Sequence, residues 1–269
     1  MKKFLLLVSL MLIQFVHGGG SFDVIVAGNG ELNAASGHIQ GICVSDEALY
    51  FSHQKGIFKV DWSGKVIKHV KAENHTGDIC YYNGRVYSAI ACYDPKLRGR
   101  GAIQEFSSDL EALRRYDLPF PIDGITQMNG FFYFGVGPNP PRAHRGNRLG
   151  KIAADFSGEI TFLKIDHGYD TKFGCQAITS YGDLLFISFY GAKTPMESAV
   201  FDKDGKLVKV LKFSASKGFA ALPPRFKSEK PRFLKLVEIH NRRKKESPKV
   251  CVYFVEYDSG KMVDITRKK

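Results

Sequence analysis

The sequence lacks most of the short motifs by which enzyme classes are identified. It contains no Gly-x-Ser-x-Gly elbow, no phosphate-binding glycine loop and no His-Glu-x-x-His zinc motif. Its cysteines form no Cys-x-x-Cys pair, and no stretch rich in proline, glycine or serine divides the chain. The absences exclude the enzyme classes that depend on these motifs, and the sequence names no cofactor and no metal ligand set.

Long apolar runs are also scarce. One run, Phe4 to Val16, follows Lys2 and Lys3 and ends just before small residues that begin at Gly18. It has about a dozen residues, whereas a membrane span needs roughly 20. This layout predicts a signal peptide over residues 1–20, cleaved near Gly18. No later run could cross a membrane, so we expect one domain over residues 21–269, secreted or periplasmic.

Cysteine is infrequent, and the number of cysteines is odd. The five are Cys43, Cys80, Cys92, Cys175 and Cys251. Four of them lie inside or beside apolar, strand-like runs. We therefore expect buried structural thiols rather than a metal site or a disulfide framework.

Acidic residues are outnumbered: 27 Asp and Glu stand against 39 Lys and Arg, for a formal net charge of +12. In an exported protein this balance favours anionic partners such as uronic or sulfated sugars, surface polymers or anionic lipid over nucleic acid. The alternative is a solvated basic surface with no partner.

A repeat runs through the rest of the chain, with a period of roughly 40 to 50 residues. Each unit begins with an apolar residue that opens a strand. These residues are Ile42, Ile79, Ile125, Ile178 and Leu222. An aromatic-rich second strand follows each of them, as in Leu49–Ser52 and Phe131–Phe134, and turn pairs such as Asn83-Gly84 and Asn129-Gly130 connect the two.

A third strand, a polar turn and a fourth strand complete each unit, and no amphipathic helix interrupts them. Four short strands repeated five times predict an all-β protein, a five-bladed β-propeller of four-stranded antiparallel blades. A β-sandwich is the alternative fold. The strand-like segment from Phe22 competes with Lys261–Ile265 for the outer place in the last blade, and an extra partial blade would make six.

Polar residues recur just before the opening residue of four units. We expect them at one mouth of the central channel, where loops on a rigid frame commonly form ligand sites. They are His38, Gln40, His75, Asp78, Asp123 and Gln176. We assign His75, Asp78 and Asp123 as the catalytic candidates, and His38, Gln40 and Gln176 as ligand-binding residues. Hydrogen-bonded ties between blades are the alternative role for the whole set.

The loops between second and third strands carry many of the basic residues, and the topology places them on the same face as these polar groups. The ligand-binding candidates among them are Arg98, Arg142, His144 and Arg145. A basic rim above a polar mouth suits an anionic or saccharide-like ligand, because Arg can grip carboxylate or sulfate with two parallel hydrogen bonds.

Two hypotheses of function remain open at this stage. In the first, an exported propeller binds, and in one version hydrolyses, a small anionic or saccharide-like ligand at the channel mouth, with Asp78 and Asp123 as an acid–base pair. In the second, a non-catalytic scaffold binds a protein or a cell-surface polymer through its basic loops. The sequence does not decide whether the protein is an enzyme, and we predict a monomer.

The segment HIQGICVSDEALYFSHQKGIFKVDWSGKVIKHV resembles a blade of the short secreted propellers that include lactonase-like, NHL-like and plant-type glutamine cyclotransferase-like proteins. In the cyclotransferases a comparable Gln-Gly step opens a blade, as Gln40-Gly41 does here. The resemblance concerns the architecture, and it implies the propeller fold rather than one activity.

Overall fold

The computed structural model describes residues 22–23, 25–27, 38–73, 75–91, 99–137, 147–168, 171, 174–190, 198–226, 228–239 and 249–267. Most of them lie in β-strands, and the helical part of these segments is a single turn, η1 (Pro224–Phe226). In the same segments, no helix has the length and apolar character of a membrane span. The signal peptide predicted over residues 1–20 lies outside the described residues.

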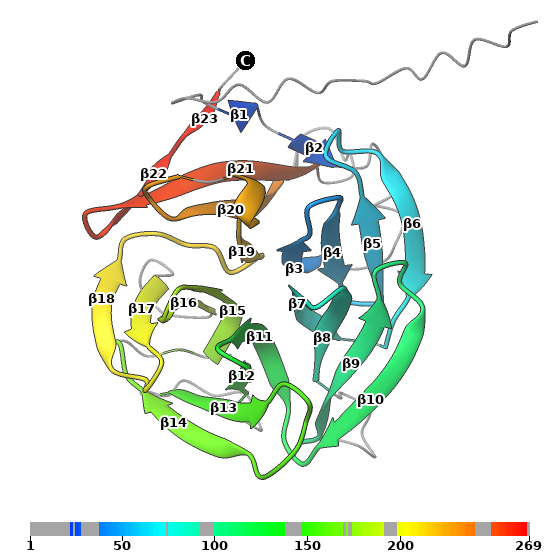
Figure 1. Cartoon of the computed structure of the whole chain (residues 1–269), viewed down its shortest axis with the longest axis vertical. Coiled ribbons are helices and arrows are strands. Elements are labelled where there is room, and N and C mark those ends of the chain that lie inside the picture. The colour runs from blue at the N-terminus through cyan, green and yellow to red at the C-terminus, as the bar shows by residue number, and fades with distance from the viewer. Residues whose placement is uncertain are drawn as a thin grey trace, which may run out of the picture.

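Five antiparallel sheets surround a central axis, and in four of them the strands follow the chain from the centre to the rim (Figure 1). Blade 1 consists of β3 (Ile39–Val44), β4 (Leu49–His53), β5 (Gly56–Val60) and β6 (Val66–Lys71), and blade 2 consists of β7 (Thr76–Tyr82), β8 (Arg85–Ala91), β9 (Gly101–Ser107) and β10 (Ala112–Leu118). Blade 3 consists of β11 (Ile122–Met128), β12 (Phe131–Val136), β13 (Asn147–Ala153) and β14 (Thr161–Ile165), and blade 4 consists of β15 (Gly174–Tyr181), β16 (Leu184–Tyr190), β17 (Ser198–Asp202) and β18 (Leu207–Leu211). The remaining sheet is blade 5. The predicted five-bladed β-propeller is confirmed.

Blade 5 closes the ring with strands from both ends of the chain. It consists of β19 (Phe219–Ala221), β20 (Arg232–Ile239) and β21 (Lys249–Asp258), and its outer place is shared by β2 (Ile25–Ala27) and β22 (Lys261–Asp264). β2 pairs with Val250–Val252 of β21, whereas β22 pairs with residues 255–258. The two segments that compete for one place in the sequence thus occupy different halves of the same long strand, and no sixth blade forms among the described residues.

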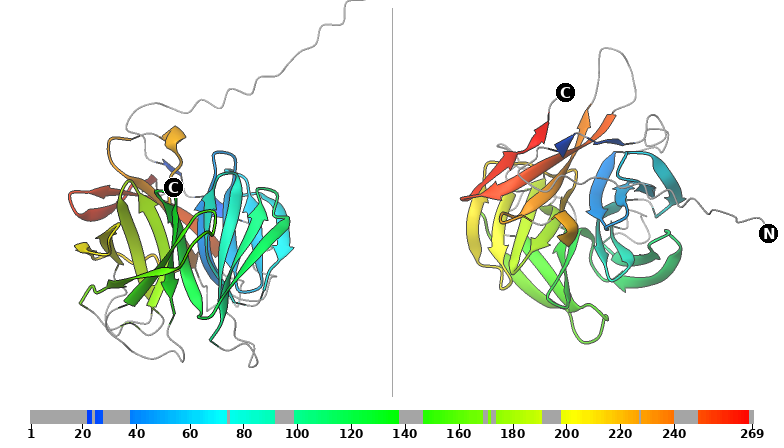
Figure 2. Two further views of the ribbon diagram at one scale, coloured as in Figure 1. Left: turned by 60° about the horizontal axis from the view of Figure 1, so that its bottom comes forward. Right: turned by 45° about the horizontal axis from the view of Figure 1, so that its top comes forward.

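The two termini of the described chain meet beside this blade. The short β1 (Phe22–Asp23) pairs in parallel with β23 (Thr266–Arg267). Figure 2 shows β1 and β2, in dark blue, against the red strands of blade 5. The first and last described strands are therefore paired beside blade 5, in addition to the pairing of β2 with β21 that closes the ring.

Local turn chemistry explains the hairpins. Asn83-Gly84 and Asn129-Gly130 connect the first and second strands of blades 2 and 3, and all four residues have positive φ, between 49° and 79°. Two consecutive positive φ values characterise the type I′ turn, whose twist matches that of paired strands. The predicted hairpin connectors are confirmed here.

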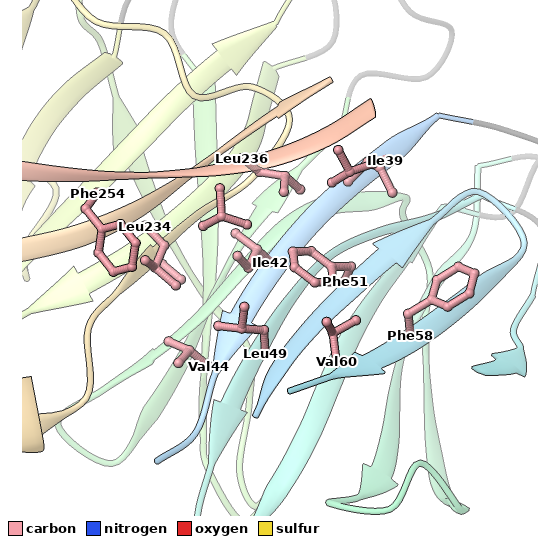
Figure 3. Packing of buried hydrophobic residues seen from close by; sticks show 13 residues of the cluster. Ile39, Ile42, Val44, Leu49, Phe51, Phe58, Val60, Leu234, Leu236 and Phe254 are labelled. Atoms are coloured by element: carbon pink, nitrogen blue, oxygen red, sulfur yellow. The ribbon is translucent and has the colours of Figure 1, made fainter. Parts of the chain in front are cut away.

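Among the described residues the core forms six clusters, of which five lie at the five contacts between neighbouring blades and the sixth pairs Ile90 with Ala102 within blade 2. Because successive side chains of a strand point to opposite faces of its sheet, Ile42 packs toward blade 5 while Cys43 packs toward blade 2. Figure 3 shows the contact between blades 1 and 5, where Leu234, Leu236 and Phe254 face Ile42 and Phe51. The aromatic second strands pack between blades, as the repeat predicts.

The opening residue of the fifth unit was placed wrongly from the sequence. β19 ends at Ala221, so Leu222 lies beyond it. It is Gly218 that lies against blade 1: a Cβ there would be 2.9 Å from the Ile42 nitrogen. Any side chain at this position would clash with blade 1. The φ of Gly218, 140°, is also one that residues other than glycine rarely adopt.

The cysteine prediction is confirmed for the described positions. Cys43, Cys80, Cys175 and Cys251 are free and buried. Burial raises the pKa of all four thiols, as expected for inert structural residues. Cys92 lies outside the described residues.

Candidate functional site

Four of the five innermost strands are interrupted by a β-bulge at the same level. Relative to its neighbour, each of these strands has one extra residue, between Ile39 and Gly41, Thr76 and Ile79, Ile122 and Ile125, and Cys175 and Ala177. A bulge redirects a side chain that would otherwise point into a blade contact. The bulges therefore mark the positions of Gln40, Asp78, Asp123 and Gln176.

A chain of hydrogen bonds crosses the channel at this level. The Gln176 amide donates to Oε1 of Gln40 over 3.1 Å, and Nε2 of Gln40 lies 2.9 Å from Nε2 of His38. Gln40 and Gln176 are both buried. Since these residues come from blades 4 and 1, which are not neighbours in the ring, the amide pair spans the channel.

Asp78 fills the centre of the channel. Its side chain is fully buried, and Oδ2 accepts hydrogen bonds from the backbone N–H groups of Ile178, at 2.9 Å, and Ile125, at 3.4 Å. A Cβ on Gly41 would lie 2.6 Å from Oδ1, so blade 1 also contacts this carboxyl. Asp78, from blade 2, thereby contacts three other blades.

Two opposing effects act on the Asp78 carboxyl. Burial raises its pKa well above the usual value, while the amides of Ile178, Ile79 and Ile125 favour the ionised form and Asp123 opposes it. Burial dominates, because the group has no contact with solvent. Burial thus favours the neutral form of the carboxyl, and Oδ2 is the oxygen that faces the amides.

Asp123 lies beside the start of one of the basic loops. Its Oδ2 is 3.5 Å from the Cβ position of Gly137, the residue that leaves β12. Its Oδ1 is buried and has no hydrogen-bond partner among the described residues. Burial raises the pKa of Asp123 to about 7, so near neutral pH the carboxyl is present in both forms.

His75 and His38 occupy equivalent places in blades 2 and 1, each just before the first strand. His75 has a φ of 68°, and the backbone there is held by its N–H bond to the Gln54 carbonyl, 2.7 Å away. Burial and then the nearby His38 lower the pKa of His75 to about 4. The imidazole is therefore neutral at physiological pH.

All six predicted polar residues come to one end of the channel, in the part where the innermost strands begin. Asp78 is offset by one position from the others, because it directly precedes Ile79 whereas Gln40, Asp123 and Gln176 stand two residues before their isoleucines. In the structure the Asp78 carboxyl lies deeper in the channel, against the amides of Ile125 and Ile178. The predicted rim residues Arg98, Arg142, His144 and Arg145 lie outside the described residues.

The sequence reasoning missed the opposite end of the channel. A cavity of about 160 Å³ there is lined by all five innermost strands, including Thr126, Thr179 and Ser180. The hydroxyls bind backbone groups: Ser180 donates to the Gln127 carbonyl and Thr179 accepts from the Ala221 amide. A small hydroxyl residue after the opening isoleucine of units three and four was the available signal.

No group of three or more His, Cys, Asp or Glu side chains within the described segments is arranged to hold a metal ion. His53 and His69 do bring Nε2 atoms within 3.3 Å of each other. However, Nδ1 of His53 accepts a bond from the Lys55 N–H, so Nε2 of His53 carries the proton and donates to His69. The two imidazoles are therefore joined by a hydrogen bond rather than arranged as two ligands of a metal ion.

Comparison with known proteins identifies the fold. No protein-family model and no curated protein matches the sequence. Among solved structures, a glutaminyl cyclase from Myxococcus xanthus is similar, with a TM-score of 0.60, 11% identity, and coverage of 88% of this chain and 97% of that one.

Two larger bacterial proteins also contain this architecture. GH43B of a Bacteroides ovatus xyloglucan PUL has a TM-score of 0.57 at 12% identity, covering 88% of this chain and 55% of its own. A bifunctional GH43-CE protein of Bacteroides eggerthii has a TM-score of 0.52 at 12% identity, covering 89% and 35%. The chain thus spans about half and about a third of their lengths. At such identities the likenesses show the β-propeller fold, and the predicted resemblance to the group that includes the cyclotransferases is confirmed at the level of architecture.

Proposed function

We propose that this chain is an exported propeller that binds a small saccharide-like or anionic ligand at the channel mouth and exchanges a proton with it through Asp123. The observation that carries the proposal is the Asp123 carboxyl, with a pKa near 7 and a buried Oδ1 without a partner among the described residues. A group with a pKa near the working pH serves equally as proton donor and acceptor.

The other polar residues at this end of the channel supply the binding groups. Gln40 and Gln176 offer amide donors and acceptors, and His38 and neutral His75 offer imidazole nitrogens. This set suits the hydroxyl groups of a sugar. The acidic part of an anionic ligand would be held by the loop that follows Gly137, which includes Arg142, His144 and Arg145, and by Arg98 of blade 2.

The proposal gives Asp78 a positioning role. A two-carboxylate hydrolysis needs both carboxyls to reach the substrate. The Asp78 side chain is fully buried, and its Oδ2 is bonded to backbone amides. Proton transfer is therefore assigned to Asp123, and His75 keeps its place as the other catalytic candidate.

The test is a binding and turnover screen over oligosaccharides, uronic-acid oligomers, lactones and an N-terminal glutaminyl peptide. Relative to wild type, Asp123→Asn should keep binding but lower turnover about 100-fold or more, whereas Gln176→Ala should weaken binding. Asp204→Asn, at an exposed turn, is the matched control. Turnover that survives in Asp123→Asn would contradict the proton-transfer role.

Binding without turnover of any substrate, lost on removal of the basic loops but not in Gln176→Ala, would instead support the non-catalytic scaffold. The net charge of +12 is the observation that favours this second candidate. Salt dependence alone does not separate the two candidates, because both involve an anionic partner.

A further inference from the structure

A second concave site lies on the circumference of the ring, away from the channel. A cleft of about 570 Å³ opens where blade 2 meets blade 3, and it is lined by residues of the outer strands β10 and β14. Figure 1 shows these two strands on the circumference of the ring. Small-molecule sites typically have volumes of about 300 to 1,000 Å³. The cleft is thus large enough for a ligand of one or two sugar rings.

Aromatic rings form the walls of the cleft. Tyr116 and Phe156 are stacked with ring centroids 3.5 Å apart, and Phe120 meets Phe162 edge to face at 5.5 Å. Phe162 is 44% exposed, a high value for a large apolar side chain. The negative ring faces attract the C–H groups of a sugar ring, which are weakly positive.

The charged groups that line the cleft are carboxylates, which accept hydrogen bonds. Asp117 and Glu159 are both exposed on its rim. Asp117 is already paired with Arg115, whose Nε lies 2.7 Å away, while Glu159 makes no ion pair within the described residues. A ligand rich in hydroxyl donors complements these carboxylates.

Cations already border the cleft, and this decides between two ligand classes. Aromatic rings with carboxylates also suit an organic cation. Here, however, the Arg148 guanidinium lies over the Phe162 ring at 5.1 Å, and Arg115 neutralises Asp117. A further cation would meet like charge, whereas a neutral ligand would not.

From these observations we propose that the cleft between blades 2 and 3 binds a neutral saccharide. The site is independent of the channel mouth, since it shares no residue with it. It would give the protein a surface contact for a glycan chain in addition to the ligand at the channel.

The experiment titrates the full chain with neutral tetrasaccharides of glucose, xylose and mannose, by calorimetry and NMR. We expect at least one to bind with a dissociation constant of roughly 1 mM. Phe162→Ala should weaken it about five- to tenfold, and Glu159→Ala about fivefold. Because Phe162 and Glu159 are exposed, both variants should fold normally, which circular dichroism verifies.

Phe131→Ala is the matched control. Phe131 lies on blade 3, is 37% exposed, and carries Lys151 over its ring at 4.3 Å, but it does not line the cleft. It should leave saccharide binding unchanged, and so should Asp204→Asn at its exposed turn.

Three results would overturn the proposal. One is tetramethylammonium binding with no saccharide binding, and another is an equal loss in Phe131→Ala and Phe162→Ala. The third is saccharide binding that is lost in Gln176→Ala but retained in Phe162→Ala. That result would place the sugar in the channel and support the proposed function alone. Loss in Phe162→Ala only would support the cleft whatever the outcome at the channel.

Discussion

At the scale of single residues, Asp78 is the side chain on which most blades converge. Asp78→Ala should leave the buried amides of Ile125 and Ile178 without an acceptor. A buried donor without a partner costs about 1 to 3 kcal/mol, so we expect a loss of about 2 to 5 kcal/mol in the free energy of unfolding. Urea denaturation measures it.

Asp78→Asn is the informative companion variant. It keeps a carbonyl oxygen for the two amides and resembles the neutral carboxyl in shape, so it should cost less than about 2 kcal/mol. If the Ala and Asn variants were equally stable, the amide contacts would not be what Asp78 contributes.

Asp123 makes a prediction about pH. Its pKa is raised from 3.8 to about 7, so the folded state holds a proton that the unfolded state releases in this window. The contribution of Asp123 to stability is therefore full below about pH 4 and falls as pH rises toward 7. The Asp123→Asn side chain stays neutral at every pH. As pH rises from about 4 to 7, the free energy of unfolding of this variant should therefore increase relative to that of wild type by up to about 4 kcal/mol.

The comparison must be made between the two proteins rather than on wild type alone. His75, with a pKa lowered to about 4, acts with the opposite sign, because its stability contribution is lost as pH falls from about 6.5 to 4. The difference between wild type and Asp123→Asn cancels this effect. If the difference in free energy of unfolding between wild type and Asp123→Asn were the same at about pH 4 and about pH 7, the pKa of Asp123 would not be raised by folding.

At the scale of elements, the second strands carry the contacts between blades. Phe186 of β16 is fully buried, and its ring lies 4.7 Å from Phe233, 5.2 Å from Tyr257 and 6.3 Å from Phe219. Phe186→Ala should reduce the free energy of unfolding by about 3 to 5 kcal/mol through loss of burial and formation of a cavity. Phe131→Ala, on an exposed face, should cost less than about 1 kcal/mol. Equal losses would mean that blade contacts do not dominate stability.

The strands themselves were predictable because their signals are local. Alternating apolar residues and Asn-Gly turns lie within a few positions of one another. The error at Leu222 has a different cause. The segment between β19 and β20 contains η1 and is longer than the two-residue turns of blades 2 and 3, so the periodic spacing no longer marks where the strand begins.

At the scale of the whole molecule, ring closure depends on β2. Removing the chain through Ala27 should expose the edge of β21 beside Val250 and Val252 and remove Ile25 from the core cluster of blades 1 and 5. A loss of about 3 kcal/mol would lower the Tm by about 5 to 10 °C. Calorimetry and limited proteolysis report it.

The control for this deletion is removal through Asp23, which eliminates only β1. β1 pairs two residues with β23, so the Tm should change by no more than about 2 °C. An intact Tm after removal through Ala27 would show that β22 closes blade 5 alone.

By itself, the sequence determined the strand order within four blades, the burial of the four described cysteines and the set of polar residues near the start of four innermost strands, because each of these follows from periodicity and turn chemistry over short distances. It left five or six blades open, and the closed ring decided for five. Only the tertiary structure decided that β2 and β22 share β21, and that Asp78 fills the channel while Asp123 stays beside its mouth. These outcomes depend on which strands face one another across a closed ring and on bulges that redirect single side chains. Such contacts join residues far apart in the chain, so no local pattern specifies them.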